Sequence, residues 1–224
     1  MKTVDNSQLE KIYRARFDDK AQVQREKMWD ILCSDWMQRY VPKDATVLDL
    51  AAGRCEFINH IQAGRKIAVD LNEDVRNYAN KDVEIVIAYS HDMQGVADNS
   101  VDVVFVSNFF EHLPDKATFM DTLKDIRRVL KVGGKLLILQ PNIRFLQGAY
   151  WDFIDHYLPL TDRSLEEALM LTQMDVVEVL PRFLPYTTRS KMPQHPFLIR
   201  AYLRLPIAFP IFGKQAWVVA VKPA

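Results

Sequence analysis

The sequence is poor in cysteine: Cys33 and Cys55 are the only two among 224 residues. Two thiols cannot build the disulfide framework of a small secreted domain, and they cannot supply four ligands to a structural zinc ion. The first residues also lack the apolar core of a secretory signal peptide. We therefore expect a protein of a reducing compartment, with the cytoplasm as its default location.

The sequence has no surplus charge of either sign, because 29 Lys and Arg residues balance 29 Asp and Glu residues. Proteins held to nucleic acid by a broad basic surface carry a clear positive excess. Balanced charge therefore argues against tRNA, rRNA and DNA as partners and leaves a local basic patch as the open alternative.

Long apolar runs are also missing. The most apolar tract, residues 197–212, is interrupted by two arginines and two prolines, which excludes an ordinary transmembrane helix. With Arg200, Arg204 and Lys214 at its edges, this tract could rest on a membrane surface or a lipid-linked substrate. A lid, a dimer face or plain core are the alternatives.

Short apolar runs alternate with helical segments in the middle of the chain. The runs cover residues 46–50, 66–70, 84–87, 101–106 and 135–140. Nearly continuous apolar runs are typical of parallel strands that are covered on both faces. The clearest helix between them spans residues 116–130, with an apolar stripe along one face. The alternation predicts an α/β fold.

The ends of the chain complete a predicted single domain, 1–224. Residues 1–42 are expected to form a helical arm, with a helix over 5–40, and residues 43–142 are expected to form the core. Residues 143–224 are expected to form an insertion on the side of a second substrate, the acceptor, and the final strands. A capping box at 164–167 predicts a further helix, and strands are expected at 174–180 and 216–221. The proline-bearing segment 181–210 shows no regular pattern.

The residues after each apolar run are the expected ligand site, since ligands bind at the carboxyl ends of parallel strands. Small residues, Ala51 and Gly53 among them, follow the first run and allow a tight turn close to a ligand. Asp70 ends the second run, 21 residues after Asp49, where an acid can accept hydrogen bonds from both ribose hydroxyls. The alternative is that Asp70 only caps the next helix.

Two further runs add candidate contacts. The third leads to Asp92, which could accept from an exocyclic amine such as that of adenine, and to Met93, which could pack on the ring. The alternative for Asp92 is a turn aspartate. The fourth run is followed by Asn108 and Phe109.

Five motifs in this order resemble a known family. They read Val-Leu-Asp-Leu-Ala-Ala-Gly at 47–53, Ala-Val-Asp-Leu-Asn at 68–72, His-Asp-Met at 91–93, Asn-Ser-Val-Asp-Val-Val-Phe-Val-Ser-Asn-Phe-Phe-Glu-His-Leu at 99–113 and Gly-Gly-Lys-Leu-Leu-Ile at 133–138. They resemble the class I S-adenosylmethionine-dependent methyltransferases, in a type-11-like branch. The resemblance implies a Rossmann-like, seven-stranded, mostly parallel sheet. Its last strand is antiparallel between its neighbours, and helices cover both faces.

The resemblance also implies roles around the cofactor S-adenosyl-L-methionine. Its methionine part would be lined by Asp49, Ala51 and Gly53, and its sulfonium region would be faced by Asn108 and Phe109. Asp70 would hold the ribose, while Leu71, Asp92 and Met93 would contact the adenine. The methionyl carboxylate would be reached from the arm by Tyr13, Arg16 and Phe17. Arginine suits a carboxylate through its forked donors. The alternative for the arm is a packed helix with solvated arginines.

The first motif departs from the family pattern, because Ala51 and Cys55 stand where two glycines are usual. Alanine is a mild change if its φ stays negative. Cys55 either weakens cofactor binding or points inward as a small buried hydrophobe. These departures motivate one alternative, a cofactor-binding partner protein without catalysis. A nicotinamide-dependent oxidoreductase is another, although the loop does not match Gly-x-Gly-x-x-Gly.

A methyl acceptor that is an alcohol needs a base, and histidine is suited to that role near neutral pH. Among five histidines, His156 follows the fifth strand, where the family builds its acceptor pocket, and Asp152 or Asp155 could orient it. His112 lies beside the expected cavity, with helix packing as its alternative role.

Further acceptor contacts are expected just past the fifth strand, from Asn142 and Arg144 and then from Tyr150 and Trp151. The segment 182–191 and the apolar tract after it resemble bacterial methyltransferases of polysaccharide and cell-envelope biosynthesis. We therefore predict methyl transfer to a hydroxyl, or less readily an amine, of a small-molecule acceptor such as a sugar or glycan intermediate. No metal site is evident in the sequence.

Overall fold

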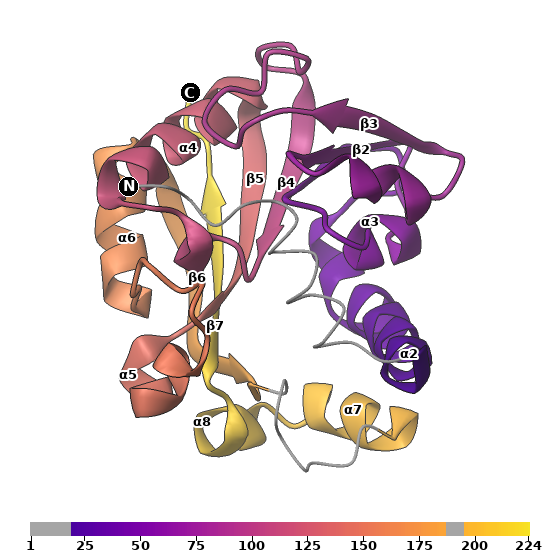
Figure 1. The fold of residues 1–224 in the computed structure, drawn as a ribbon, viewed down its shortest axis with the longest axis vertical. Helices are drawn as coiled ribbons and strands as arrows, with labels where there is room; N and C mark the ends of the chain where they lie inside the picture. Colours follow the sequence, from indigo (N-terminus) through magenta and orange to yellow (C-terminus); the bar gives the residue numbers. More distant parts are fainter. Residues whose placement is uncertain (1–18, 187–194) are drawn as a thin grey trace.

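The computed structural model describes residues 19–186 and 195–224. Its centre is a seven-stranded sheet in the order β3-β2-β1-β4-β5-β7-β6 (Figure 1). The strands are β1 (Thr46–Leu50), β2 (Arg65–Asp70), β3 (Val83–Ile87), β4 (Val101–Ser107), β5 (Leu130–Pro141), β6 (Asp175–Leu184) and β7 (Gln215–Val221). β1 to β5 pair in parallel, and β7 runs antiparallel between β5 and β6. The predicted fold class is confirmed.

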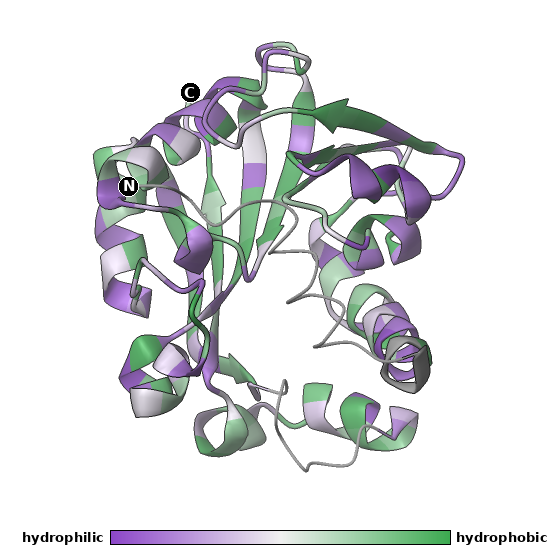
Figure 2. Ribbon diagram, in the orientation of Figure 1, coloured by the Kyte–Doolittle hydropathy of each residue, from purple (hydrophilic) through white to green (hydrophobic). Residues whose placement is uncertain are grey.

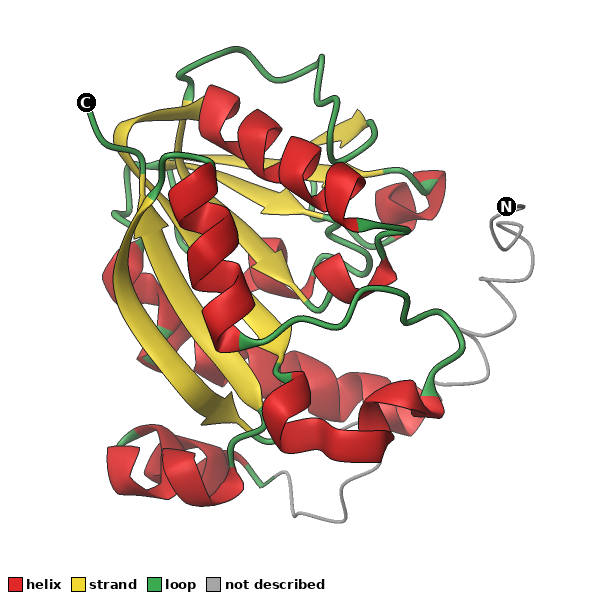
Figure 3. Ribbon diagram, turned by 90° about the vertical axis from the view of Figure 1, so that its left-hand side faces the viewer, coloured by secondary structure: helices red, strands yellow, loops and turns green. Residues whose placement is uncertain are grey.

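Helices cover both faces of this sheet (Figure 3). They are α2 (Asp19–Asp35), α3 (Glu56–His60), α4 (Lys116–Val129), α5 (Ile143–Leu146), α6 (Asp162–Leu171), α7 (Pro196–Leu203) and α8 (Phe209–Phe212), with short 3-10 helices η1 (Met37–Tyr40), η2 (Glu73–Asn77), η3 (Phe110–His112), η4 (Gln147–Asp152) and η5 (Pro206–Ala208). α4 and α6 lie on one face, while α2 and α3 lie on the other (Figure 1). None of the described helices is long and apolar enough to cross a membrane.

Each face of the sheet has its own buried core, because successive side chains of a strand point to opposite faces. Leu48 packs in the cluster that includes Phe119 of α4, while its neighbour Val47 packs in the cluster that includes Phe57 of α3. Figure 2 shows hydrophobic residues concentrated in the strands. Burying one large apolar side chain contributes about 1.5–3 kcal/mol, so these two clusters are the main source of stability.

The order of the strands places the ligand site. β1 has β2 on one side and β4 on the other, so the chain direction through the sheet reverses at β1. Loops diverge at such a point and leave a crevice beyond the carboxyl ends of the strands. The segments that follow β1, β2 and β4 therefore share one edge of the sheet.

Several boundaries differ from the sequence prediction. α6 begins earlier, because its capping box joins Thr161 and Ser164 instead of residues 164–167. β5 begins at Leu130, directly after α4, since that residue already pairs with Val101 of β4. β6 continues through Pro181, which an edge strand tolerates because the missing N–H removes no necessary ladder bond. Of the predicted helix over 5–40, the part before residue 19 lies outside the described residues.

Candidate active site

The loop after β1 holds three alternate residues in the left-handed backbone region. The φ angles of Ala51, Gly53 and Cys55 are 56°, 52° and 59°. The condition under which alanine would be a mild change, a negative φ at Ala51, is therefore not met. A non-glycine residue pays about 1–2 kcal/mol there, because its Cβ crowds the following carbonyl. The backbone N–H of Ala52 donates to Val69 O of β2 at 3.2 Å, which holds the strained turn against the sheet.

Cys55 points inward. Its side chain is fully buried, and its Sγ lies 3.9 Å from the carbonyl oxygen of Val75 in η2. Burial raises the pKa of this thiol to about 12, so it stays protonated at neutral pH. Of the two alternatives for Cys55, the structure supports the buried hydrophobe.

Asp70 joins the loops after β1 and β2. Its Oδ2 accepts from the backbone N–H of Gly53 and its Oδ1 from that of Asn72, both at 2.8 Å. Burial raises the pKa of Asp70 in spite of these bonds. A carboxylate offers about four acceptor positions, and the backbone N–H of Leu71 also bonds to Asp70, so at least one position remains for a ribose hydroxyl. The residue that caps η2 is Asn72, whose side chain accepts from Asp74, and Asp70 is not the cap.

Two of the residues predicted to contact the cofactor, Asp49 and Met93, are buried inside the protein. Asp49 is only 4% exposed and accepts a backbone hydrogen bond from Ile58 of α3, and burial raises the pKa of Asp49 well above its usual range. Its buried carboxylate therefore stabilises the loop after β1 from the interior of the protein. Met93 is fully buried in the core, and its backbone N–H donates to Asp125 Oδ2 at 2.7 Å. Its side chain packs among core residues, so the expectation that it lies against adenine is not supported.

Other predicted contacts lie at the edge of the sheet. Leu71 and Asp92 are exposed after β2 and β3. Asn108 follows β4 with a φ of 48°, a conformation that asparagine tolerates better than most residues, and its Nδ2 donates to Ser107 Oγ at 2.9 Å. Phe109 is partly buried against the core. Tyr13, Arg16 and Phe17 lie outside the described residues.

The acceptor side is built by a loop that is fastened to η3. The backbone N–H groups of Tyr157 and Leu158 donate to the carbonyl oxygen of Glu111 at 2.8 and 3.1 Å. His112 Nδ1 lies 2.8 Å from the carbonyl oxygen of Asp155 and 3.5 Å from its Oδ2. These contacts hold the loop 153–158 beside the end of β4, so the sequence-predicted histidines come together.

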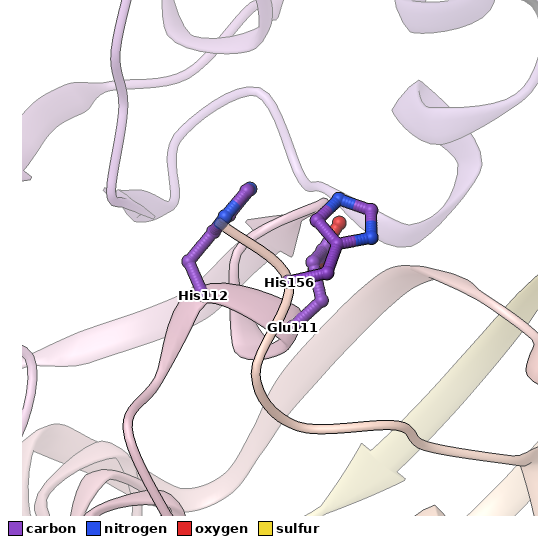
Figure 4. A group of neighbouring side chains, drawn as sticks. All are labelled: Glu111, His112 and His156. Carbon is purple, nitrogen blue, oxygen red and sulfur yellow. The ribbon is translucent and has the colours of Figure 1, made fainter. Parts of the chain in front are cut away.

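His156 sits in a largely aromatic enclosure and is 7% exposed. Its ring centroid lies 4.6 Å from that of Tyr150, 5.0 Å from that of Phe153 and 5.1 Å from that of His112. Figure 4 shows Glu111 and His112 on one segment and His156 on the loop that passes beside it. The predicted base therefore lies next to a carboxylate and a second imidazole.

Glu111 and Gln140 are site residues that the sequence reasoning missed. Glu111 is 1% exposed, and its Oε2 accepts from Gln140 Nε2 at 2.9 Å. Burial raises the pKa of Glu111. The sequence did offer one signal for Glu111, because it stands next to His112, directly after the fourth strand. Its link to Gln140 of β5 follows only from the strand order.

Asn142 and Arg144, which were expected to contact the acceptor, have partners within the protein. Asn142 is almost fully buried, and its Nδ2 donates to Asp162 Oδ1 at 2.8 Å and to the carbonyl oxygen of Pro181 at 3.0 Å. Arg144 Nη1 donates to both carboxylate oxygens of Asp162 at 2.8 Å. These contacts with Asp162 fasten the segment after β5 to α6.

The two aromatic candidates differ in exposure. Tyr150 is fully buried, and its hydroxyl donates to the carbonyl oxygen of Leu158 at 2.6 Å, so it supports the floor beneath His156 and offers no hydroxyl to an acceptor. Trp151, its neighbour in η4, is 55% exposed and remains available at the rim.

Comparisons with known proteins agree with this geometry. The family model "Methyltransferase domain" matches residues 48–138. A demethylmenaquinone methyltransferase of Halalkalibacterium halodurans is 27% identical over 173 residues, which are 68% of this chain and 67% of that protein. The ubiquinone/menaquinone biosynthesis C-methyltransferase UbiE of Klebsiella pneumoniae is 30% identical over 136 residues, 53% of each chain. The chain thus spans half to two thirds of the length of these relatives.

A solved structure supports the fold. The crystal structure of an S-adenosylmethionine-dependent methyltransferase from Archaeoglobus fulgidus covers 92% of this chain and 100% of its own, with a TM-score of 0.66 and 21% identity. These matches favour methyl transfer over the nicotinamide alternative. The match to the methyltransferase domain model and the curated methyltransferase relatives support an S-adenosylmethionine-dependent methyltransferase, and the solved structure supports the class I fold.

Proposed function

We propose that the protein transfers the methyl group of S-adenosylmethionine to a hydroxyl oxygen of a small acceptor bound beside Glu111, His112 and His156. The observation that carries this proposal is one of placement. The loops fastened by Asp70 follow β1 and β2, Glu111 and His112 follow β4, and His156 lies in the segment after β5. These four parallel strands end at one edge of the sheet. A cofactor in the first group of loops would present its sulfonium toward the second.

The chemistry needs position first and proton removal second. As the S–CH₃ bond breaks and the O–CH₃ bond forms, the acceptor oxygen must lie about 3 Å from the methyl carbon and in line with sulfur. The hydroxyl must also lose its proton. His112 is oriented for this task, because a carbonyl oxygen only accepts. Its Nδ1 must therefore carry the hydrogen bonded to Asp155, which leaves a lone pair on Nε2. His156, beside it, is the second candidate base.

We propose a sugar or glycan intermediate as the acceptor. The exposed indole of Trp151 offers an apolar platform for one face of a sugar ring, and the imidazoles of His112 and His156 offer partners to its hydroxyls.

The test is methyl transfer from labelled S-adenosylmethionine to a panel of sugars and sugar nucleotides. His156→Ala should lower kcat by about 10²–10⁴-fold on the true acceptor, the usual range for loss of a general base, while the Kd for S-adenosylmethionine stays unchanged. His60→Ala is the matched control, since the His60 Nδ1 contacts the Glu56 carbonyl oxygen of its own helix, away from this cluster. Turnover by the His156 variant at the wild-type rate would remove it as base.

A second candidate is methylation of a ring carbon on a membrane-dissolved quinol. The curated relatives carry quinone C-methyltransferase names. A cavity of about 680 Å³ lies between η1, β6 and α8, lined by Trp36, Phe145 and Phe209 among others. Phe197 and Ile207 expose large apolar surfaces beside Arg200 and Arg204. Such a surface fits a lipid bilayer and the tail of an isoprenoid acceptor.

The two candidates differ in product. The methyl-transfer assay is repeated with vesicles that contain a demethylated quinol in place of the sugars. Proton NMR of the product then distinguishes a methyl group on oxygen from one on a ring carbon. An O-methyl sugar supports the first candidate, and a C-methyl quinone overturns it in favour of the second.

A further inference from the structure

Three potential metal ligands converge on the acceptor side. One ligand atom each from Glu111, His112 and His156 lies within 4.8 Å of the other two (Figure 4). Two imidazoles and one carboxylate form a donor set that suits divalent first-row transition ions, from Mn²⁺ and Fe²⁺ to Zn²⁺. With metal–nitrogen distances of about 2.0–2.1 Å, neighbouring ligand atoms lie roughly 3.3 Å apart.

The neighbours of these side chains match the outer shell of a metal site. Metal-binding histidines almost always donate their second ring N–H to a carbonyl or carboxylate, and His112 Nδ1 does so toward Asp155 at 2.8 Å. Ligating carboxylates are likewise held by hydrogen bonds, and Glu111 Oε2 accepts from the buried Gln140 at 2.9 Å. The orientation of both side chains is therefore set before any ion arrives.

The charge balance of the cluster also favours a cation. Glu111 is buried, and no lysine or arginine within residues 19–186 and 195–224 forms an ion pair with its carboxylate. A buried carboxylate costs free energy unless an opposite charge or hydrogen bonds compensate for it. Gln140 supplies one hydrogen bond, and a divalent ion would supply the charge.

We propose that Glu111, His112 and His156 bind one divalent transition-metal ion, which holds the acceptor oxygen for methyl transfer. Three protein ligands leave a coordination position open for that oxygen. A bound hydroxyl loses its proton more readily, because the ion stabilises the alkoxide. The hydroxyl proton leaves to solvent, the S–CH₃ bond breaks as the O–CH₃ bond forms, and the products are the methyl ether and S-adenosylhomocysteine. This role rests on the proposed methyl transfer but replaces the histidine base with the ion, because a ring lone pair bound to metal cannot accept a proton. The binding of the ion does not depend on the proposed function.

The first experiment measures binding alone. The full chain, freed of metal by dialysis against a chelator, is titrated with Co²⁺ and followed by calorimetry and by the visible absorption of the bound ion. One equivalent should bind. Glu111→Gln, which keeps the shape of the side chain, and His156→Ala should each lower the affinity by at least 100-fold, and Gln140→Ala by about 10–100-fold.

His60→Ala is again the control and should bind Co²⁺ as the wild type does. The Kd for S-adenosylmethionine, measured in every variant, shows that the chain still folds. Absence of Co²⁺ binding, or binding that Glu111→Gln and His156→Ala leave unchanged, overturns the metal site and leaves three neighbouring side chains with no common ligand.

The second experiment tests the role of the ion. Removal of metal should lower kcat for the acceptor at least 10-fold, and addition of Zn²⁺, Mn²⁺ or Co²⁺ should restore it. Unchanged turnover without metal overturns the role while the proposed methyl transfer stands. Site-specific Co²⁺ binding without turnover of any hydroxylated acceptor supports the metal site and contradicts the proposed function instead.

Discussion

The backbone N–H of Gly53 donates to Asp70 Oδ2 at 2.8 Å, so the loop after β1 is fastened to the end of β2 by the same carboxylate that is expected to hold the ribose. One side chain thus shapes the loop and offers acceptors to the ligand. A change at Asp70 should therefore affect binding through both routes.

We predict that Asp70→Ala weakens S-adenosylmethionine binding by about 10–150-fold, because a hydrogen bond to a charged group contributes about 1.5–3 kcal/mol. Isothermal titration calorimetry gives the affinity, and circular dichroism checks the fold. Glu73→Ala, which removes an exposed acid from the adjoining η2 helix, should bind as the wild type does. An unchanged affinity in a folded Asp70→Ala variant would place the ribose elsewhere.

Ala51→Gly should make the protein more stable, by about 1 kcal/mol. Glycine adopts a positive φ at no steric cost, and this gain exceeds the greater entropy it gives the unfolded chain. Chemical denaturation measures the change. Ala52→Gly is the matched control, since Ala52 is not among the residues with positive φ and should lose about 0.5–1 kcal/mol. A loss of stability in both variants would contradict the strain at Ala51.

Asp49→Asn should alter the pH dependence of stability. Burial raises the pKa of Asp49 in the folded protein above its unfolded value. Such a group stabilises the folded state below the unfolded pKa, near 3.9, and this contribution is lost as pH rises toward the folded pKa. The asparagine variant has no such loss and can still accept from Ile58. Its free energy of unfolding relative to the wild type should rise between pH 4 and pH 7, as urea titrations at several pH values would show.

Asp162 should show the opposite behaviour. Burial alone would raise the pKa of Asp162, but hydrogen bonds from Asn142 and Arg144 hold it below its usual value. This contribution is present above the unfolded pKa and is lost as pH falls through the folded pKa. Asp162→Ala should cost about 1–3 kcal/mol at pH 7, since it leaves the buried Asn142 amide without one of its partners.

The difference between Asp162→Ala and the wild type should shrink toward pH 3, because protonation removes the same interaction in the wild type. Asp121→Ala, which breaks an exposed pair with Lys124, is the control and should change stability by less than about 0.5 kcal/mol. A cost that stays constant from pH 7 to pH 3 would show that the carboxylate charge is not what binds Asn142.

The sequence predicted the sheet well, because its strands are buried on both faces and read as continuous apolar runs. Asp70 was predictable for a related reason: it ends such a run, and the carboxyl end of a parallel strand is where ligands bind. The sequence predicted where the loop after β1 lies but not its backbone conformation, because the residues around Ala51 do not indicate whether its φ is positive or negative.

The acceptor side was harder to predict. Asn142 and Arg144 are polar residues at the right edge of the sheet, but their partner, Asp162, belongs to a helix whose position depends on the whole insertion. Glu111 and His156 are far apart in sequence and meet only because the loop 153–158 is fastened to η3. Contacts of this kind depend on tertiary structure, which local patterns do not record.

The antiparallel β7 has a consequence for synthesis on the ribosome. β6 emerges first, and among residues 19–186 and 195–224 the only strand that pairs with it is β7, which follows it in sequence. During translation the backbone groups of β6 are therefore unpaired. They stay open to pairing with other nascent chains until β7 pairs with both β5 and β6. The parallel strands β1 to β5, which carry the loops of the candidate site, can pair earlier, so the antiparallel pair β6 and β7 would be the last part of the sheet to form.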